Sequence, residues 1–293
     1  MSVAAVTREL LVRCLDLWLA EAVHGARRGT VALCFDERSA KPAAVVAATV
    51  ETMTEFADRL GRRSLTLVVV APAAVPGPDP ATLPAQVAVH ALAGPVATML
   101  PAALVAAKAA GAPVFLFADA APTPPLTALG PARSADALLV GPAAGWAECR
   151  DSLRGHGWLS CGVGLVGEAE ERLLAFGTGA GKRLAAFKDE LWAVDADTGV
   201  RYRDPADPHG DPIAISLTPR PGPLRRELLA RLTVTGGGTV TELRDFALAE
   251  TIYRAVDVTH ELTHLVGAGQ VAREPAHGRL AGDVQVTPMA PGR

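Results

Sequence analysis

A segment near the end of the chain has the spacing of a zinc site. His260-Glu261-Leu262-Thr263-His264 follows the pattern H-E-x-x-H, which on a helix places two imidazoles on one face for Zn²⁺ and supplies a glutamate as general base. Gln270 stands where a longer zinc-peptidase motif has a third histidine, and glutamine is a poor zinc ligand. Apolar residues at helical spacing, Val258, Leu262 and Leu265, favour a helix that packs into a core. We therefore interpret the segment as structural and keep a zinc metallopeptidase, with His260 and His264 as ligands, as an alternative.

Two glycine-containing segments resemble nucleotide-binding loops but lack part of each pattern. Residues 162–167 (GVGLVG) satisfy G-x-G-x-x-G, yet polar residues and another apolar run follow where a helix should begin. Residues 179–183 (GAGKR) resemble the end of a phosphate loop. When Gly181 and Lys182 are aligned with the G-K pair of G-x-x-x-x-G-K-[ST], Phe176 occupies the first glycine position and Arg183 replaces the Mg²⁺-binding serine or threonine. We expect neither segment to bind a nucleotide, although a helix that begins beside Lys182 could bind an anion.

The alternation of apolar runs and helical patterns predicts the elements that must position any such site. Short runs that are apolar on both faces predict buried parallel strands, and helical patterns lie between them. The expected strands span residues 30–35, 65–70, 86–90, 113–118 and 136–140, and the expected helices span residues 8–24, 42–60, 96–110 and 146–154. Residues 158–166 and 172–177 flank a turn too short for a crossover helix, so they predict an antiparallel hairpin. We expect an α/β protein with five parallel strands, helices on both faces and a terminal antiparallel hairpin, which is the element order of the Rossmann-like methyltransferase fold.

A second domain is expected after a helix over residues 181–194. Residues 195–223 are rich in Asp, Pro and Gly and predict a boundary. Helical patterns follow at 224–232, 240–249 and 258–266, and the chain ends in a glycine-containing hairpin, so these residues predict a winged helix-turn-helix. We place a Rossmann-like methyltransferase-type domain at 1–212 and a winged helix-turn-helix domain at 213–293.

Three segments carry a resemblance to a known family. They are Arg172–Thr178 (RLLAFGT), Lys188–Val194 (KDELWAV) and Glu250–Val271, in which ETIY precedes the spacing L-x-x-L-x-x-x-G-x-V. With these segments the chain resembles the three-Cys-motif partner proteins (TcmP). The resemblance covers most of the chain and implies a methyltransferase-type domain with a winged-helix tail. It also implies a protein partner, to which the three cysteines of the family name belong.

Two segments depart from the pattern that this resemblance implies. Residues 36–42 (DERSAKP) replace a glycine-containing stretch after the first strand, and Asp119-Ala-Ala-Pro replaces Asp-Pro-Phe-Gly after the fourth. Glycines let a backbone approach S-adenosylmethionine closely, and residues 70–72 (VAP) lack an acid for the ribose hydroxyls. We expect a degenerate site that binds no cofactor, with Asp36, Glu37 and Asp119 as its remaining polar groups and S-adenosylmethionine as the alternative.

The charge of the expected winged helix does not favour nucleic acid. Residues 221–293 hold eight Arg, no Lys and eight Asp or Glu, whereas DNA binding calls for a positive excess. The expected recognition helix also carries Asp257 and Glu261. Arg273, Arg279 and Arg293 could form a basic wing, so nucleic acid is an alternative partner beside protein.

Composition limits the class of protein. With 293 residues, of which 49% are hydrophobic and 20% charged, the chain can bury a core, and its net charge of −3 suggests no general affinity for polyanions. It has no run of about 20 apolar residues and no signal peptide at Met1, so we expect a cytoplasmic protein without membrane contact. The four cysteines (Cys14, Cys34, Cys149 and Cys161) are far apart and are expected to be isolated thiols.

These observations lead to one hypothesis and three alternatives. We expect a TcmP-like protein with a degenerate S-adenosylmethionine site that acts as a non-catalytic binding or scaffolding partner. The alternatives are a methyltransferase or another small-molecule enzyme with a remodelled cleft, a winged-helix nucleic-acid-binding regulator, and a zinc metallopeptidase.

Overall fold

The computed structural model describes residues 2–120, 126–131, 134–168, 170–194, 200–207, 213 and 222–289. The chain forms two compact units, Met1–Ile213 and Ala214–Arg293, which are described separately below. The expected domain boundary after residue 212 falls among residues 208–212 and 214–221, which lie outside the described residues.

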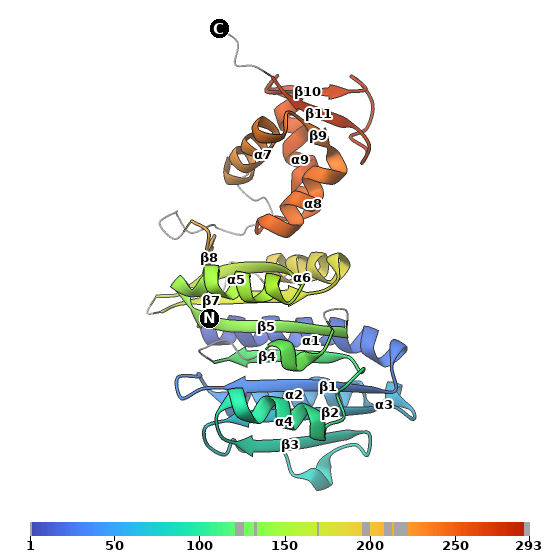
Figure 1. Ribbon diagram of the computed structural model, residues 1–293, viewed down its shortest axis with the longest axis vertical. Coiled ribbons are helices and arrows are strands. Elements are labelled where there is room, and N and C mark those ends of the chain that lie inside the picture. Colours follow the sequence, from blue (N-terminus) through green and yellow to red (C-terminus); the bar gives the residue numbers. More distant parts are fainter. Residues whose placement is uncertain are drawn as a thin grey trace. The chain divides into compact units, whose positions relative to one another are not determined.

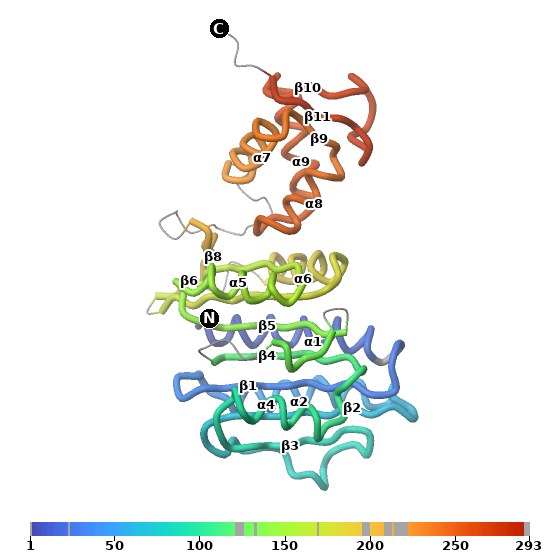
Figure 2. The backbone as a smooth tube through the Cα atoms, viewed as in Figure 1, coloured from blue at the N-terminus to red at the C-terminus, as the bar shows by residue number. Residues whose placement is uncertain are grey.

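An eight-stranded sheet forms the centre of the first unit, and its strands can be followed in Figures 1 and 2. Their spatial order is β3-β2-β1-β4-β5-β7-β6-β8. The strands are β1 (Arg28–Phe35), β2 (Ser64–Ala71), β3 (Val87–Ala93), β4 (Val114–Asp119), β5 (Ala135–Pro142), β6 (Leu159–Val166), β7 (Glu171–Thr178) and β8 (Arg201–Arg203). Strands β1 to β5 pair in parallel, β7 is antiparallel to both β5 and β6, and β8 is antiparallel to β6. The predicted α/β class, with a mostly parallel sheet and an antiparallel hairpin, is confirmed.

Helices cover both faces of this sheet because its central strands bury side chains on both sides. Alternate residues such as Ala32, Val68 and Leu116 share one core cluster with side chains of α4 (Val96–Ala106) and α5 (Trp146–Gly155). The residues between them point to the opposite face. There α1 (Val3–Gly25) packs against the sheet and against both α2 (Pro42–Glu55) and α6 (Gly181–Ala193).

Several boundaries differ from those expected. The helix α1 begins at Val3 rather than near residue 8, because the Ser2 hydroxyl accepts a hydrogen bond from the Ala5 N–H at 3.3 Å and caps the first turn. The helix expected over residues 42–60 is two helices, α2 and the short α3 (Ala57–Leu60), with Phe56 between them. Short 3₁₀ turns span Pro80–Thr82, Leu126–Leu129 and Ala143–Gly145.

One strand lies inside the segment expected to be only a boundary. The three residues of β8 pair with Gly164–Val166 of β6. Tyr202 is buried at its centre, and the Tyr202 hydroxyl donates to the Val194 carbonyl at 3.3 Å. A three-residue strand with arginine on both sides of one apolar residue has too little pattern to be recognised in the sequence.

In its described residues, 222–289, the second unit combines three helices with a small antiparallel sheet. Its elements are α7 (Gly222–Thr235), β9 (Gly238–Thr239), α8 (Val240–Glu250), α9 (Ala255–Gly267), β10 (Val271–Glu274) and β11 (Gln285–Pro288). The strands lie in the order β10-β11-β9. Helix α8 begins with a capping box in which Thr239 and Glu242 exchange side-chain to backbone hydrogen bonds. The apolar residues expected to face a core, Val258, Leu262 and Leu265, are all buried.

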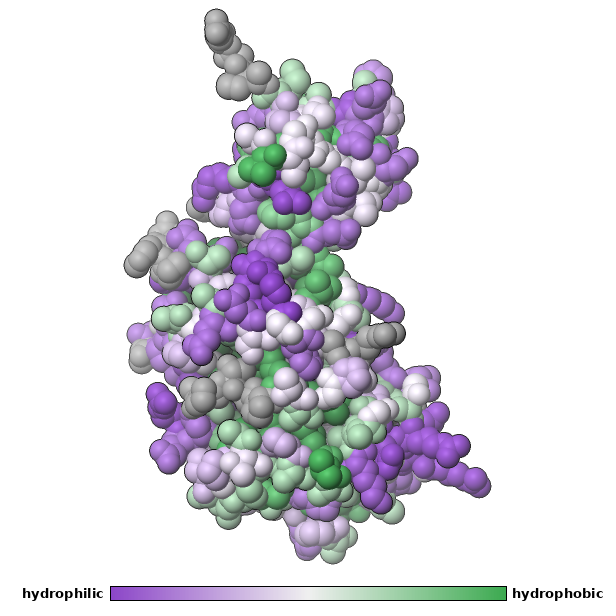
Figure 3. Space-filling model, viewed as in Figure 1, coloured by the Kyte–Doolittle hydropathy of each residue, from purple (hydrophilic) through white to green (hydrophobic). Residues whose placement is uncertain are grey.

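The surface is mixed in character. On the face seen in Figure 3, hydrophilic side chains gather beside α3, where Asp58, Arg59 and Arg62 are exposed. Within the part of the chain that the structure describes, none of the helices combines the length and apolarity needed to cross a membrane. As expected, all four cysteines are buried free thiols, and burial raises the pKa of Cys34 to about 12.

Candidate functional site

The structure brings two of the three predicted cleft residues together at the carboxyl edge of the sheet. Asp36 follows the end of β1, Asp119 is the last residue of β4, and the Asp36 N–H donates to the Asp119 carbonyl at 3.1 Å. The Ser39 hydroxyl donates to the same carbonyl, and the Asp36 carboxylate accepts from the Arg38 N–H at 2.8 Å. Glu37 is exposed. Side chains of the turn after β1 are therefore hydrogen-bonded within the turn and to the end of β4.

Asp119 is engaged in an ion pair that the sequence did not predict. The Arg172 Nη2 atom, from β7, lies 2.5 Å from Asp119 Oδ1, and Arg172 Nε donates to the Gly141 carbonyl at 3.3 Å. Asp119 is only 8% exposed, and burial raises its carboxyl pKa above the usual value although Arg172 lowers it. The arginine therefore occupies the space over the ends of β4 and β5.

Among the residues that the structure describes, the cavity beside these side chains is small. The cavity at this edge, here called the carboxyl-edge cavity, has a volume of about 30 Å³. Its lining includes Val3, Ala4 and Thr7 from the first turns of α1, together with Asp119 and Arg172. Pockets for small-molecule ligands typically measure about 300–1,000 Å³, whereas a single water needs roughly 10–15 Å³. As its described residues line it, this cavity suits one or two waters and is too small for an adenosyl nucleoside.

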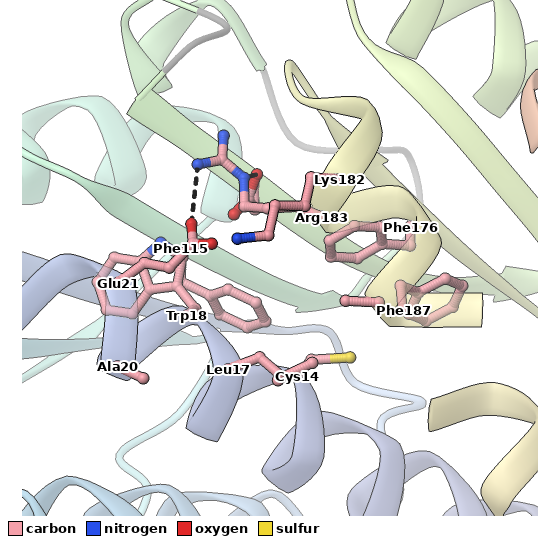
Figure 4. Close-up of a pocket in the computed structure, with 12 residues that line it drawn as sticks. Cys14, Leu17, Trp18, Ala20, Glu21, Phe115, Phe176, Lys182, Arg183 and Phe187 are labelled. Atoms are coloured by element: carbon pink, nitrogen blue, oxygen red, sulfur yellow. Dashed lines mark ion pairs between the residues drawn. The ribbon is translucent and has the colours of Figure 1, made fainter. Parts of the chain in front are cut away.

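A larger cavity lies at the opposite, amino edge of the same sheet. This amino-edge pocket has a volume of about 240 Å³. In the sheet, Phe115 of β4 is in register with Asp136 of β5, and Asp136 is in register with Thr178 of β7. These three side chains and Phe176 therefore share one face, where α1 and α6 enclose the pocket (Figure 4).

Aromatic rings form two opposite walls of the amino-edge pocket. Trp18 and Phe115 lie on one side with ring centroids 5.9 Å apart and planes tilted by 56°. Phe176 and Phe187 lie on the other side, stacked at 4.6 Å with an interplanar angle of 13°. The buried Cys14 thiol also lines the space, and burial raises its pKa. The body of this pocket is thus apolar.

Charged groups lie at one side of the pocket. Arg183 Nε is 3.0 Å from Asp136 Oδ1 and 3.1 Å from the Thr178 hydroxyl, and Arg183 Nη1 is 3.6 Å from Glu21 Oε2. Asp136 is 1% exposed, and burial raises the pKa of its carboxyl group to about 6, although Arg183 opposes the shift. Lys182 also lines the pocket and is exposed. Among these charged residues, only Lys182 was predicted from the sequence, as a possible anion contact.

The residues of the H-E-x-x-H segment are divided between two sides of α9. His260 and His264 are exposed neighbours with ring centroids 5.0 Å apart. Glu261 is 1% exposed and forms an ion pair with Arg225 of α7, whose Nε atom lies 2.6 Å from Glu261 Oε1. The glutamate therefore binds two helices of the core together and does not lie beside the two histidines. Within the described ranges, no group of three or more His, Cys, Asp or Glu side chains is placed to hold a metal ion.

Arg273 and Arg279, the two residues predicted to contact nucleic acid, differ in whether their side chains are engaged within the protein. The Arg273 guanidinium donates to the carbonyls of Pro275 and Gly278, both at 2.8 Å, and to those of His277 and Arg279 at 3.3 and 3.2 Å. It therefore holds the loop between β10 and β11 rather than extending from it. The Arg279 side chain is exposed, and Arg293 lies outside the described residues.

The glycines of the G-x-G-x-x-G segment serve packing. Gly162 and Gly164 lie within β6, and a Cβ atom at Gly162 would be 2.6 Å from two ring carbons of Trp146. No helix begins after Gly167, because β7 follows. The absence of side chains here lets the Trp146 ring lie against the strand.

No protein-family model, curated protein or solved structure matches the chain. Residues 172–178, one of the three segments singled out in the sequence, lie in β7, which supplies Arg172 to the carboxyl-edge cavity and Phe176 to the amino-edge pocket.

Proposed function

We propose that the chain is a TcmP-like protein that acts as a non-catalytic binding or scaffolding partner. Two features of the fold support this proposal. Five parallel strands followed by an antiparallel hairpin agree with a Rossmann-like methyltransferase-type domain. The order α7-β9-α8-α9-β10-β11 agrees with a winged helix-turn-helix.

The observation that carries the non-catalytic role is the filling of the carboxyl edge. Open α/β sheets usually bind ligands there. In this chain the first turns of α1 and the Asp119–Arg172 ion pair leave a cavity of about 30 Å³. The turn at residues 36–41 contains no glycine and is also held by the Ser39 hydroxyl, which accepts from the Asp36 N–H and donates to the Asp119 carbonyl. A cofactor would have to displace these groups and separate a buried ion pair, which is costly.

An uncharged edge of the sheet supports protein binding. Strand β3 ends the sheet, and residues 80–107, which include β3 and α4, contain no Asp, Glu, Lys or Arg. Natural proteins usually protect such edges with charges. Ala88, His90 and Ala91 of β3 are exposed, and Val105 of α4 is 79% exposed. We assign the β3 edge and α4 as the surface for a protein partner.

The role of the second unit follows from its charged residues. Arg273 is bound to its own loop, and Glu261 is paired with Arg225. Both arrangements favour a structural or protein-contact role for the winged helix over nucleic-acid binding, because they engage two charged side chains that phosphate groups would otherwise meet.

A co-purification experiment with a matched control tests the partner surface. The tagged wild-type chain is compared with Ala91→Lys, which places a charge on the β3 edge, and with Ala147→Lys, which places one on the exposed side of α5. We expect the native host to yield a protein that the wild type and Ala147→Lys retain and that Ala91→Lys loses. The same set of proteins in all three samples, or none in any, contradicts the proposed surface.

A further inference from the structure

The amino-edge pocket has the properties of a small-molecule site, and it is independent of the function proposed above. We propose that this pocket binds a small organic acid whose aromatic or branched aliphatic body lies between the Trp18–Phe115 and Phe176–Phe187 walls and whose carboxylate is held at Lys182. This site lies at the edge of the sheet opposite to the one where ligands of such folds usually bind.

The size and lining of the pocket determine the body of the ligand. Its volume of about 240 Å³ is eight times that of the carboxyl-edge cavity, at about 30 Å³, but lies just below the range of about 300–1,000 Å³ for drug-sized ligands. A single ring or a short branched chain is therefore the right size. The four aromatic side chains, together with Leu17 and Ala186, would contact a ligand of this size on several sides.

The charges favour an acid over an amine. Both acidic side chains that line the pocket, Glu21 and Asp136, already face Arg183 at 3.6 and 3.0 Å. Within the described residues, the Lys182 ammonium group has no hydrogen bond or ion pair, so it is the charge that remains for a ligand. Figure 4 shows Lys182 and Arg183 on the same side of the pocket, across from Phe187.

The start of α6 adds to the positive potential beside Lys182. This 13-residue helix begins after Ala180, which provides no side-chain cap, and its first turn contains no acidic residue. The positive end of the helix dipole is therefore not neutralised by the helix itself. A carboxylate at Lys182 would compensate both the dipole and the ammonium charge.

Asp136 and Arg183 have a positioning role in this site. Asp136 of β5 is faced by Arg183 from α6, by Glu21 from α1 and by the Thr178 hydroxyl from β7. Its Oδ1 atom lies near Arg183 Nε but forms no well-aligned hydrogen bond in the described part of the chain. The carboxylate therefore holds the guanidinium by charge at the side of the pocket where Glu21 also lies.

Three probes that share a phenyl ring and differ in charge test the proposal. Phenylacetate, phenylacetamide and phenethylamine are titrated into the full chain, and binding is followed by NMR chemical-shift changes and by the fluorescence of Trp18 in a variant whose other three tryptophans are replaced by phenylalanine. We expect phenylacetate to bind about 5- to 10-fold more tightly than phenylacetamide, because it gains a charge-assisted contact, and phenethylamine to bind more weakly than both.

Two variants locate the site. Lys182→Gln is expected to reduce the affinity for phenylacetate to that for phenylacetamide and to leave phenylacetamide binding unchanged. Ala186→Phe, which fills the pocket, is expected to abolish the binding of both, and Arg62→Gln is an exposed control that should change neither. Failure of all three probes to bind, equal affinities for them, or phenylacetate binding that survives both Lys182→Gln and Ala186→Phe overturns the proposal.

Discussion

Arg172 of β7 extends across the end of β5, and its Nη2 atom lies 2.5 Å from Oδ1 of Asp119 at the end of β4. The contact depends on the position of β7, which pairs with β5 on one side and β6 on the other. It places a guanidinium group at the edge of the sheet where open α/β sheets usually bind ligands. The same arginine also donates to the Gly141 carbonyl, so it connects three strands.

Removal of this arginine should destabilise the first unit. Arg172→Met leaves the buried Asp119 carboxylate without its partner, and we expect the free energy of unfolding to fall by about 2–3 kcal/mol, because both side chains are largely buried. Urea unfolding measures the change, and Arg201→Met on β8, where the arginine is exposed, should have little effect. A second substitution, Asp119→Asn, should restore part of the loss. Strictly additive effects of the two substitutions would contradict the ion pair.

Gly162 should tolerate no side chain. In Gly162→Ala the new Cβ atom would be 2.6 Å from Trp146 ring carbons, so we expect a loss of about 1–3 kcal/mol in the free energy of unfolding. The matched control is Gly141→Ala in β5, where no atom lies within 4 Å of the added carbon. Thermal and urea unfolding compare the two. Equal stability of both variants would show that the Trp146 contact is not tight.

The buried carboxyl group of Asp136 should give stability a specific pH dependence. Its pKa is raised from 3.8 to about 6, so between these values the folded chain keeps a proton that the unfolded chain releases. The contribution of Asp136 to the free energy of unfolding is therefore highest below about pH 4 and falls as pH rises to about 6, by about 3 kcal/mol in all. Urea unfolding of the wild type and Asp136→Asn at several pH values isolates this contribution. A difference between the two proteins that stays constant from pH 4 to pH 7 is the contrary result.

The H-E-x-x-H segment should behave as part of a core. Arg225→Met leaves Glu261 buried and unpaired, and we expect it to lower the free energy of unfolding by about 2–3 kcal/mol. The exposed neighbour Arg226→Met is the control for this change. His264→Ala removes only an exposed ring, so its effect should stay within about 0.5 kcal/mol. Stoichiometric zinc in the purified protein that is lost in His264→Ala would instead support the metallopeptidase alternative.

Much of the first unit could be predicted because its strands are buried on both faces. Continuous apolar runs such as residues 30–35 and 65–70 mark β1 and β2, and the short turn before residue 172 marks the hairpin of β6 and β7. Strand β8 was missed because it is too short to show a pattern. The sequence also did not indicate that β7 lies between β5 and β6, because this order depends on which strand of the hairpin pairs with β5.

The sites were harder to predict than the elements. Asp36 and Asp119 could be placed at one edge because parallel strands end together. The partner of Asp119 is 53 residues away in the sequence and belongs to an antiparallel strand, so no local pattern indicates it. The amino-edge pocket combines α1, three strands and α6, and its aromatic residues look like ordinary core positions in the sequence.

Calorimetric titration of the full chain with S-adenosylmethionine tests most directly whether the carboxyl edge is closed. With a cavity of about 30 Å³ and Asp119 bound to Arg172, we expect no binding heat at ligand concentrations up to about 1 mM, which corresponds to a binding free energy weaker than about −4 kcal/mol. A saturating isotherm with a Kd in the low micromolar range would show instead that the edge opens to hold an adenosyl nucleoside, and it would contradict the non-catalytic role.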